Sequence, residues 1–405
     1  MMIDRREFMR LCAGAAAFGA GMGSFFLKRA LADMPVLDDS YPFFCPELIE
    51  ITKPGPIIAP DGSCVCGWAK RPILELNFDD AKFAPSKKEM KKAFKKWDMY
   101  HVYTPELAMQ FLVAWIPYAA FFNANIYVRA TNRFYEDTRF LPANPEIEMM
   151  PDSGGGRTVF DAGAAKAVFE VVGDTHRLSV RFDSFSTADK EAADLNLSGG
   201  EDSRTSFNVD AEMSYPADHA SIAGVHMTNP RRCHYGHKIN CMETEGSVEF
   251  GGNVYRMSRE NSFAALDFGR GHYPKKMFWH WATASGRHSD GKLIGFNLGF
   301  GNSPKNTTEN ALFYDGKLTK VNAVECLPPP DSDPERPCLV RDFEGLVDLS
   351  FKPIKTRRID TKIGSGYSRG RPSLGLYSGV IASPDGGTLP VKDLFGLYEW
   401  VDSNW

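Results

Sequence analysis

Apolar and polar side chains alternate along much of this chain, in short runs that end at turn-forming residues. Such alternation predicts β-strands with one buried face. Three segments combine it with a central turn and predict hairpins: 248–257 around Gly251-Gly252, 310–321 around Asp315-Gly316, and 378–393 around Asp385-Gly386-Gly387. No long run has helical periodicity, so the sequence favours an all-β chain whose sheets hide their edges in barrels or sandwiches.

Two segments require a choice between readings. The apolar run 111–128, "FLVAWIPYAAFFNANIYV", is long enough for a membrane helix, but Pro117, Asn123 and Asn125 interrupt it. We expect two adjacent buried strands there. The basic run 85–97, "PSKKEMKKAFKKW", predicts a short solvated helix before a strand; contact with anionic lipid is the alternative.

The first thirty-two residues resemble a twin-arginine export signal. Arg5-Arg6 are followed by a weakly apolar Gly- and Ala-rich core, and Ala30-Leu31-Ala32 is a small-residue cleavage pattern. We expect cleavage after Ala32, a mature chain that starts at Asp33, and residence in the bacterial periplasm with the twin-arginine translocase as a partner during export. A retained signal anchor is the alternative. The mature chain should contain no stable membrane span.

Charge and cysteine content narrow the functional classes. The chain has 47 basic and 51 acidic residues; without the five basic and two acidic residues of the signal, 42 basic and 49 acidic residues remain, which predicts no nucleic-acid partner. An oxidising compartment permits disulfides among the remaining cysteines. Cys233 with Cys241 and Cys326 with Cys338 are the first pairs to test, because each would close a short loop.

The segment 266–286, "LDFGRGHYPKKMFWHWATASG", concentrates candidate chemistry. Asp267 and Arg270 could form an acid–base or clamp pair, or a buried salt bridge that fixes a turn. Trp279 and Trp281 would share one face of a strand, with His280 on the other. Such a wall, with Tyr273 nearby, suits either a cationic intermediate or any apolar ligand, and core packing is the commonest use.

Further candidates lie outside that segment. Glu309 and Asn310 pair a carboxylate with an amide, as an acid and an oxygen-positioning group or as a turn cap. Asp98 and Tyr100 should share one strand face and could add polar groups from the first half of the chain. The remaining ligand-binding candidates are Trp68 and Arg71.

Other motifs favour plainer readings. "GYSRG" at 366–370 fits a nucleophile elbow, but neither the required strand nor the helix flanks Ser368. Cys233, His234, His237 and Cys241 have a spacing that zinc can use, although a disulfide or a plain loop is favoured. No phosphate loop or dinucleotide fingerprint is present. We therefore expect no metal and no cofactor.

Six ordered blocks resemble one bacterial family of unknown function. They are "GWAKRPILELN" (67–77), "KKWDMYHVY" (95–103), 238–257, 266–286, "GFNLGFGNSPKNTTENALFYDGKL" (295–318) and 376–405. That family is more distantly similar to two-lobed lipocalin-like proteins, among them carotenoid hydratases and tocopherol cyclase. The resemblance implies two tandem lipocalin-like antiparallel β-barrels with few short helices, and a ligand pocket between or within them.

With a seam near 225–245, the expected organisation is a signal at 1–32, an extension at 33–60, a first β domain at 61–235 and a second at 236–405. Two functions follow from the resemblance and the candidate residues. One is a cofactor-independent hydratase, cyclase or isomerase of an isoprenoid, steroid or lipid-like substrate, with Asp267, Glu309 and a tyrosine as proton donors. The other is a non-catalytic periplasmic carrier of a hydrophobic molecule. A buried carboxyl with a raised pKa would favour the enzyme.

Overall fold

The structure is a computed structural model that describes residues 45, 47–53, 55–83, 86–142, 146–188, 203–301, 307–327, 337–363 and 366–404. Most of this part is β-strand, with the short helices α3 (Lys87–Ala93), η1 (Phe78–Asp80) and η2 (Arg129–Thr131). No helix in these ranges is long and apolar enough to cross a membrane. The all-β prediction is confirmed. The predicted export signal at 1–32 lies outside the described residues.

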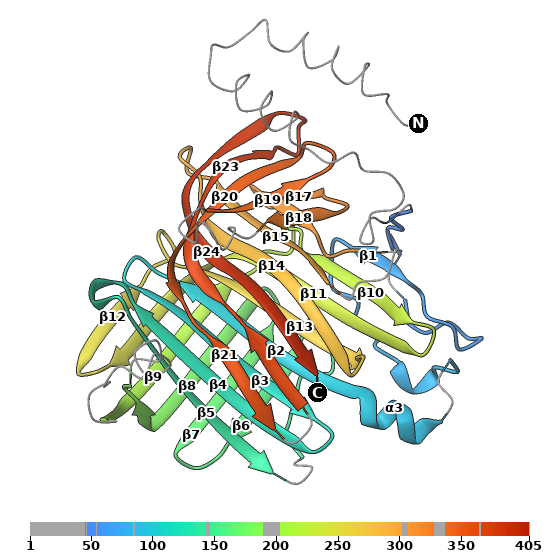
Figure 1. Ribbon diagram of the computed structural model, residues 1–405, viewed down its shortest axis with the longest axis horizontal. Coiled ribbons are helices and arrows are strands. Elements are labelled where there is room, and N and C mark those ends of the chain that lie inside the picture. The colour runs from blue at the N-terminus through green and yellow to red at the C-terminus, as the bar shows by residue number, and fades with distance from the viewer. Residues whose placement is uncertain are drawn as a thin grey trace, which may run out of the picture. The chain divides into compact units, whose positions relative to one another are not determined.

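The first sheet contains thirteen strands of the described chain, all antiparallel where they pair (Figure 1). Its main path runs β5-β4-β3-β2-β13-β11-β9-β8-β7-β6, and β1, β10 and β12 extend it beside β11. The strands are β1 (Gly67–Ala69), β2 (Phe94–Tyr103), β3 (Leu107–Ile116), β4 (Ala119–Val128), β5 (Arg133–Pro142), β6 (Gly156–Asp161), β7 (Ala165–Val172), β8 (Thr175–Ser186), β9 (Arg204–Ser214), β10 (Ile222–Asn229), β11 (Arg232–Phe250), β12 (Asn253–Met257) and β13 (Phe263–His272).

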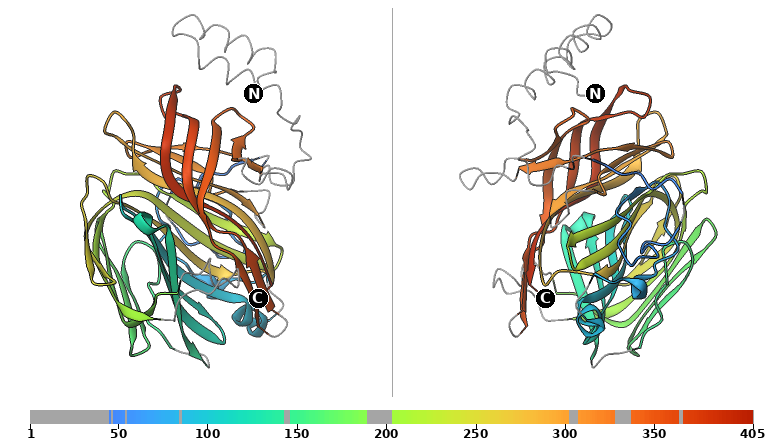
Figure 2. Two further views of the ribbon diagram at one scale, coloured as in Figure 1. Left: turned by 60° about the vertical axis from the view of Figure 1, so that its left-hand side comes forward. Right: turned by 90° about the vertical axis from the view of Figure 1, so that its right-hand side faces the viewer.

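The second sheet contains eleven strands of the described chain, with the main path β17-β16-β15-β14-β24-β23-β20-β19-β18; β22 pairs with β24, and β21 pairs with β22. Figure 2 shows its orange and red strands as a layer of their own beside the blue and green strands of the first sheet. The strands are β14 (Lys276–Arg287), β15 (Leu293–Gly301), β16 (Ala311–Tyr314), β17 (Lys317–Lys320), β18 (Val324–Leu327), β19 (Cys338–Asp342), β20 (Val347–Thr356), β21 (Ile359–Ile363), β22 (Gly366–Gly370), β23 (Ser373–Ala382) and β24 (Thr388–Asn404).

Local turn signals in the sequence located three of the hairpins correctly. The hairpins β11–β12, β16–β17 and β23–β24 form at the three predicted places. At the second, Asp315 and Gly316 both have positive φ, 53° and 75°, as a tight two-residue hairpin turn requires. The run 111–128 forms the end of β3 and all of β4, paired in antiparallel register. The basic helix α3 begins at Ser86, whose hydroxyl accepts a hydrogen bond from the Glu89 amide (3.2 Å).

The predicted seam at residue 235 differs from the division seen in the structure. Residue 235 lies inside β11, a 19-residue strand that pairs with β9, β10, β12 and β13 of the same sheet. The sheets instead divide between β13 and β14. Residues 229–232, inside the range of the predicted seam, form the tight turn of the β10–β11 hairpin.

The strand β11 also separates two cysteines that were expected to be close. Cys233 and Cys241 are eight positions apart on it, and an extended strand advances about 3.3 Å per residue, so no disulfide can join them. Cys326 and Cys338 lie on the neighbouring strands β18 and β19 and are both buried as free thiols.

Aromatic side chains fill the interior of the first curled sheet. Phe111, Phe182, Phe185, Phe207 and Phe250 are buried and in ring-to-ring contact there. At the open edge, the Asp137 carboxylate of β5 accepts hydrogen bonds from the Ser186 amide (3.1 Å) and from Arg204 (3.0 Å), which fasten β5 toward β8 and β9. A ligand inside the first curled sheet would have to displace this packed core. A binding site is therefore more readily formed in the space between the two sheets.

Side chains of β11 and β13 meet those of β14 and β15 where the two sheets face each other. Asn240 of β11 donates to the Thr283 hydroxyl (2.9 Å) and to the Phe296 carbonyl (3.1 Å). Asn240 is buried, so these bonds satisfy an amide that water does not reach.

Candidate functional site

Charged and aromatic side chains gather between the two sheets, and we call this group the inter-sheet cluster. The first sheet contributes Trp97, His226, Lys238 and Asp267, and the other side contributes Trp281, Glu309 and Glu399. Register explains the gathering: Lys238 of β11 lies directly opposite Asp267 of β13, while Trp281 of β14 lies opposite Glu399 of β24.

Lys238 joins the two halves of the cluster. Its ammonium group forms an ion pair with Asp267, lies 3.7 Å from Glu309 Oε2, and stands 5.4 Å from the ring centre of Trp281. The other Glu309 oxygen is 3.2 Å from His226 Nε2. Asp267 in turn accepts a hydrogen bond from Trp97 Nε1 (3.0 Å). Both carboxylates therefore have a cationic or N–H partner.

A row of glycines makes room for the Glu309 side chain and the Trp97 ring. Gly224, Gly236 and Gly269 lie opposite one another on β10, β11 and β13. A Cβ at Gly236 would come within 1.9 Å of Glu309 Oε1, and one at Gly269 within 2.2 Å of the Trp97 ring. The cluster therefore depends on bare backbone at this row.

The environment keeps Glu309 ionised. Burial opposes ionisation, but the Lys238 charge and the hydrogen bond with His226 outweigh it and lower the pKa of Glu309 to about 2. The pKa of Lys238 is raised, because Asp267 and Glu309 more than offset its own desolvation. A carboxyl group with so low a pKa is ionised at neutral pH, which fits a fixed anion better than the expected proton donor.

Glu399 has the opposite behaviour. Burial raises the pKa of this carboxyl and the charge of Asp267 adds to the effect, against a hydrogen bond from Trp279 Nε1 (3.1 Å to Oε2) and the charge of Arg357. It is only 8% exposed. One region thus contains one carboxyl group whose pKa is lowered and one whose pKa is raised, the arrangement that separates base and acid roles.

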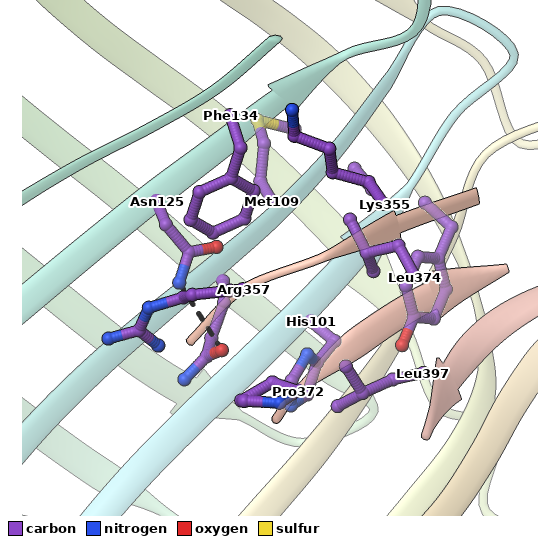
Figure 3. Close-up of a pocket in the computed structure, with 12 residues that line it drawn as sticks. His101, Met109, Asn125, Phe134, Lys355, Arg357, Pro372, Leu374 and Leu397 are labelled. Carbon is purple, nitrogen blue, oxygen red and sulfur yellow. Dashed lines mark hydrogen bonds between the residues drawn. The ribbon is translucent and has the colours of Figure 1, made fainter. Parts of the chain in front are cut away.

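A small cavity lies between the sheets (Figure 3), and Arg357, whose charge acts on Glu399, is one of the residues that line it. Its volume is about 20 Å³, enough for one water molecule. His101 and Tyr103 line it, and neither His101 Nε2 nor the Tyr103 hydroxyl has a hydrogen-bond partner in the described part of the chain. Burial and the Lys238 charge lower the pKa of His101 to about 3, so its ring is neutral and can hold a water molecule.

A wider groove adjoins this cavity. Its volume is about 200 Å³, and Tyr103 lines both hollows. Phe263, Leu394 and Phe395 give the groove apolar walls. An apolar molecule in the groove would therefore contact Tyr103, which also lines the small cavity.

The structure brings five of the predicted site residues into or beside the cluster. Asp267, Glu309 and Trp281 are members. Trp279 donates to Glu399, and Tyr273 packs on Trp97 with ring centres 4.7 Å apart. Trp279 and Trp281 share one face of β14, as their spacing predicted, and His280 on the other face stacks on Phe300 (4.6 Å).

The predicted pairing of Asp267 with Arg270 is wrong. Three positions apart on β13, the two side chains leave opposite faces of the strand. Arg270 points into the first curled sheet, where it donates to Asp98 Oδ1 (2.7 Å) and to the Met150 carbonyl (2.9 Å). Tyr100 shares a face with Asp98 as predicted, but that face is also interior, and its hydroxyl is 2.8 Å from His176 Nδ1.

The other three candidates have local roles. Arg71 donates to the Tyr215 hydroxyl (3.0 Å) on the far side of β10 from the cluster. Asn310 accepts from the Gly299 amide (2.7 Å) and donates to the Asn322 carbonyl (2.9 Å). Trp68 is buried with Lys320 5.6 Å from its ring centre. None of the three contacts the cluster directly, although the backbone next to Asn310 carries Glu309.

Sequence reasoning did not include His101, Tyr103, His226, Lys238 or Glu399 among the candidate site residues. Lys238 is two positions from Asn240 on β11, so strand alternation puts both side chains on the same face. Only the β11–β13 register, however, places Lys238 opposite Asp267. His234 and His237, considered as zinc ligands, lie on opposite faces of β11. Within the described ranges no group of three or more His, Cys, Asp or Glu side chains could hold a metal ion.

Residues 48–405 match a protein family described as domain of unknown function DUF2804. The chain belongs to this family. Its fold is similar to that of a protein assigned as AttH from Nitrosomonas europaea, with 12% identity and a TM-score of 0.48, over 86% of this chain and 99% of that one. Kievitone hydratase from Nectria haematococca is also similar, with 12% identity and a TM-score of 0.37, over 77% and 88%. No curated protein matches the chain. The DUF2804 match confirms the predicted membership of a family of unknown function.

Proposed function

We propose that this DUF2804 protein binds an apolar small molecule between its two sheets and converts it by cofactor-independent acid–base chemistry, as a hydratase, cyclase or isomerase. The observation that supports this most is the opposite behaviour of two buried carboxyl groups in one region. The pKa of Glu309 is lowered to about 2, and the pKa of Glu399 is raised.

For hydration, Glu399 would give its proton to one carbon of a double bond. The oxygen of a water molecule held by His101 and Tyr103 would bond to the other carbon, and that water would return one proton to the Glu399 carboxylate. The net change is the addition of one water. Positive charge that develops on carbon would lie near the rings of Trp279 and Trp281 and the fixed anions Asp267 and Glu309, which stabilise it.

Native mass spectrometry of protein from the producing cell, followed by organic extraction, would identify a bound molecule. The extracted compound is then incubated with the wild type and with Glu399→Gln. We expect the mass of the product to exceed that of the extracted compound by one water for a hydratase, or to equal it for a cyclase or isomerase. The rate should be at least about a hundredfold lower in the variant. Glu325→Gln is the matched control, because burial also raises the pKa of Glu325 but it lies on β18, away from the cluster.

A carrier is the second candidate, and the small size of the cavity at His101 favours it. A carrier would return the extracted compound unchanged from wild type and variant alike, with equal affinity. Protein that binds no apolar compound at all would overturn both readings. The same mass spectrum tests the proposed periplasmic residence, since twin-arginine export with cleavage leaves a chain that begins at Asp33.

A further inference from the structure

The wide groove beside the cavity has a charged group that nothing in the described chain neutralises. Arg129, from η2 at the end of β4, lines the groove and packs its guanidinium 3.7 Å from the ring centre of Phe395. Its Nε is buried without a hydrogen-bond partner, and no carboxylate pairs with it among the described residues. Burial lowers the pKa of Arg129, although the group stays charged at neutral pH.

The other charged groups of the groove leave an excess of positive charge. Arg287 is already paired with Glu243, and it donates to the Gly291 carbonyl (2.7 Å). Lys392 is exposed, and Asp393 beside it is the acidic side chain that would oppose an anion. With Arg287 balanced by Glu243 and Lys392 by Asp393, Arg129 remains uncompensated.

Two buried hydroxyls point to a ligand with oxygen atoms. Tyr103 lines the groove as well as the small cavity, its side chain is only 3% exposed, and its hydroxyl has no partner in the described chain. Ser285, also buried, accepts hydrogen bonds from the Cys241 amide (3.0 Å) and from Asn240 (3.3 Å). Both hydroxyl groups can donate a hydrogen bond to an acceptor in the groove.

We propose that this groove binds the carboxylate of an amphipathic organic acid, with the head group at Arg129 and the apolar body against Phe263 and Leu394. The planar guanidinium can donate two parallel hydrogen bonds to a carboxylate, and Phe395 already holds it in place. This inference rests on the proposed function in one respect, since it names the substrate class of that site as a carboxylic acid. The groove of about 200 Å³ suits a short chain beside the head group.

Isothermal titration with three probes of equal chain length tests the assignment: octanoate, octan-1-ol and octylamine. We expect octanoate to bind at least about tenfold more tightly than octan-1-ol, and octylamine to bind most weakly. In Arg129→Gln, octanoate affinity should fall about tenfold or more while octan-1-ol affinity is unchanged. Arg129→Lys, which retains the charge but not the fork, should keep part of the preference.

Arg133→Gln is the matched control, because it removes one exposed positive charge a few residues further along the chain and should leave all three affinities unchanged. Equal binding of octanoate and octan-1-ol by the wild type would overturn the assignment. So would a preference for octanoate that survives in Arg129→Gln. The tests of binding and of turnover are independent of each other. Loss of turnover in Glu399→Gln with unaltered octanoate binding would bear on the proposed reaction and not on the carboxylate site.

Discussion

Glu309 and Glu399 have the same side chain and opposite proton affinities because their neighbours differ. Glu309 lies within 3.7 Å of an ammonium group and 3.2 Å of an imidazole nitrogen. Glu399 has an indole N–H as its hydrogen-bond donor, and the charge of Asp267 acts against its ionisation. Burial raises the pKa of both carboxyl groups, and the neighbouring charges and hydrogen bonds decide that the net shift is downward for Glu309 and upward for Glu399.

The lowered pKa of Glu309 links stability to pH. The folded state holds this group ionised down to about pH 2, whereas the ordinary pKa is 4.5, so its contribution is present above pH 4.5 and is lost as the pH falls toward 2. We expect Glu309→Gln to lower the free energy of unfolding at pH 7 by about 2 to 3 kcal/mol, with a difference that shrinks between pH 4.5 and 2.

Urea denaturation of both proteins at several pH values between 7 and 3 measures this difference. Glu75→Gln removes an exposed carboxylate and serves as the control, with a difference near zero throughout. A constant gap between Glu309→Gln and the wild type across that range would show that Lys238 and His226 do not hold Glu309 ionised.

Sequence reasoning identified individual reactive side chains better than their partners. Asp267 and Glu309 stood out by residue type, but Lys238 lies 29 and 71 positions away from them, and only strand register brings the three together. Arg270 was paired with Asp267 because the two are close in sequence. Because side chains alternate along a strand, residues three positions apart point to opposite faces. Strand alternation would therefore have predicted the correct arrangement, whereas closeness in sequence did not.

At the scale of elements, the glycine row across β10, β11 and β13 shapes the site. Gly224, Gly236 and Gly269 leave the sheet face without side chains where Glu309 and Trp97 lie. Hairpins were predictable because their signal is a local turn pair. The glycine row was not, since its members come from three strands whose pairing is set by long-range register.

Gly236→Ala tests the role of that row. The new methyl group would meet Glu309 Oε1 at 1.9 Å and must push the carboxylate away from His226 and Lys238. We expect the free energy of unfolding to fall by about 1 to 3 kcal/mol and the pH dependence described for Glu309 to weaken. In the control Gly155→Ala the nearest atom to the new methyl group is the Val171 carbonyl oxygen at 4.0 Å, an ordinary contact, so neither quantity should change. If the pH dependence of stability is unaltered in Gly236→Ala, the glycine row does not contribute to keeping Glu309 ionised.

At the scale of the whole described body, polar bonds between the sheets connect them as firmly as apolar contacts do. Asn240 reaches from β11 to β14 and β15, and Arg357 after β20 pairs with Glu136 of β5 (2.5 Å). Residues 42–405 accordingly form one compact unit. The family resemblance implied two β domains but could not show that the long strand β11 belongs wholly to the first sheet.

These connections predict that the two sheets unfold together. Asn240→Ala removes buried hydrogen bonds to the second sheet and leaves the Phe296 carbonyl and the Thr283 hydroxyl without that donor, so the free energy of unfolding should fall by about 2 kcal/mol. Lys238 still bridges to Glu309, and the transition should therefore stay single. Equilibrium urea unfolding followed by tryptophan fluorescence and by far-ultraviolet circular dichroism provides two probes whose curves should coincide in the wild type and in the variant.

Asn208→Ala, which removes an exposed amide bonded to Glu249, is the control and should change the midpoint little. Two separated transitions in Asn240→Ala would instead mean that each sheet is stable alone, and that the inter-sheet cluster can open without global unfolding.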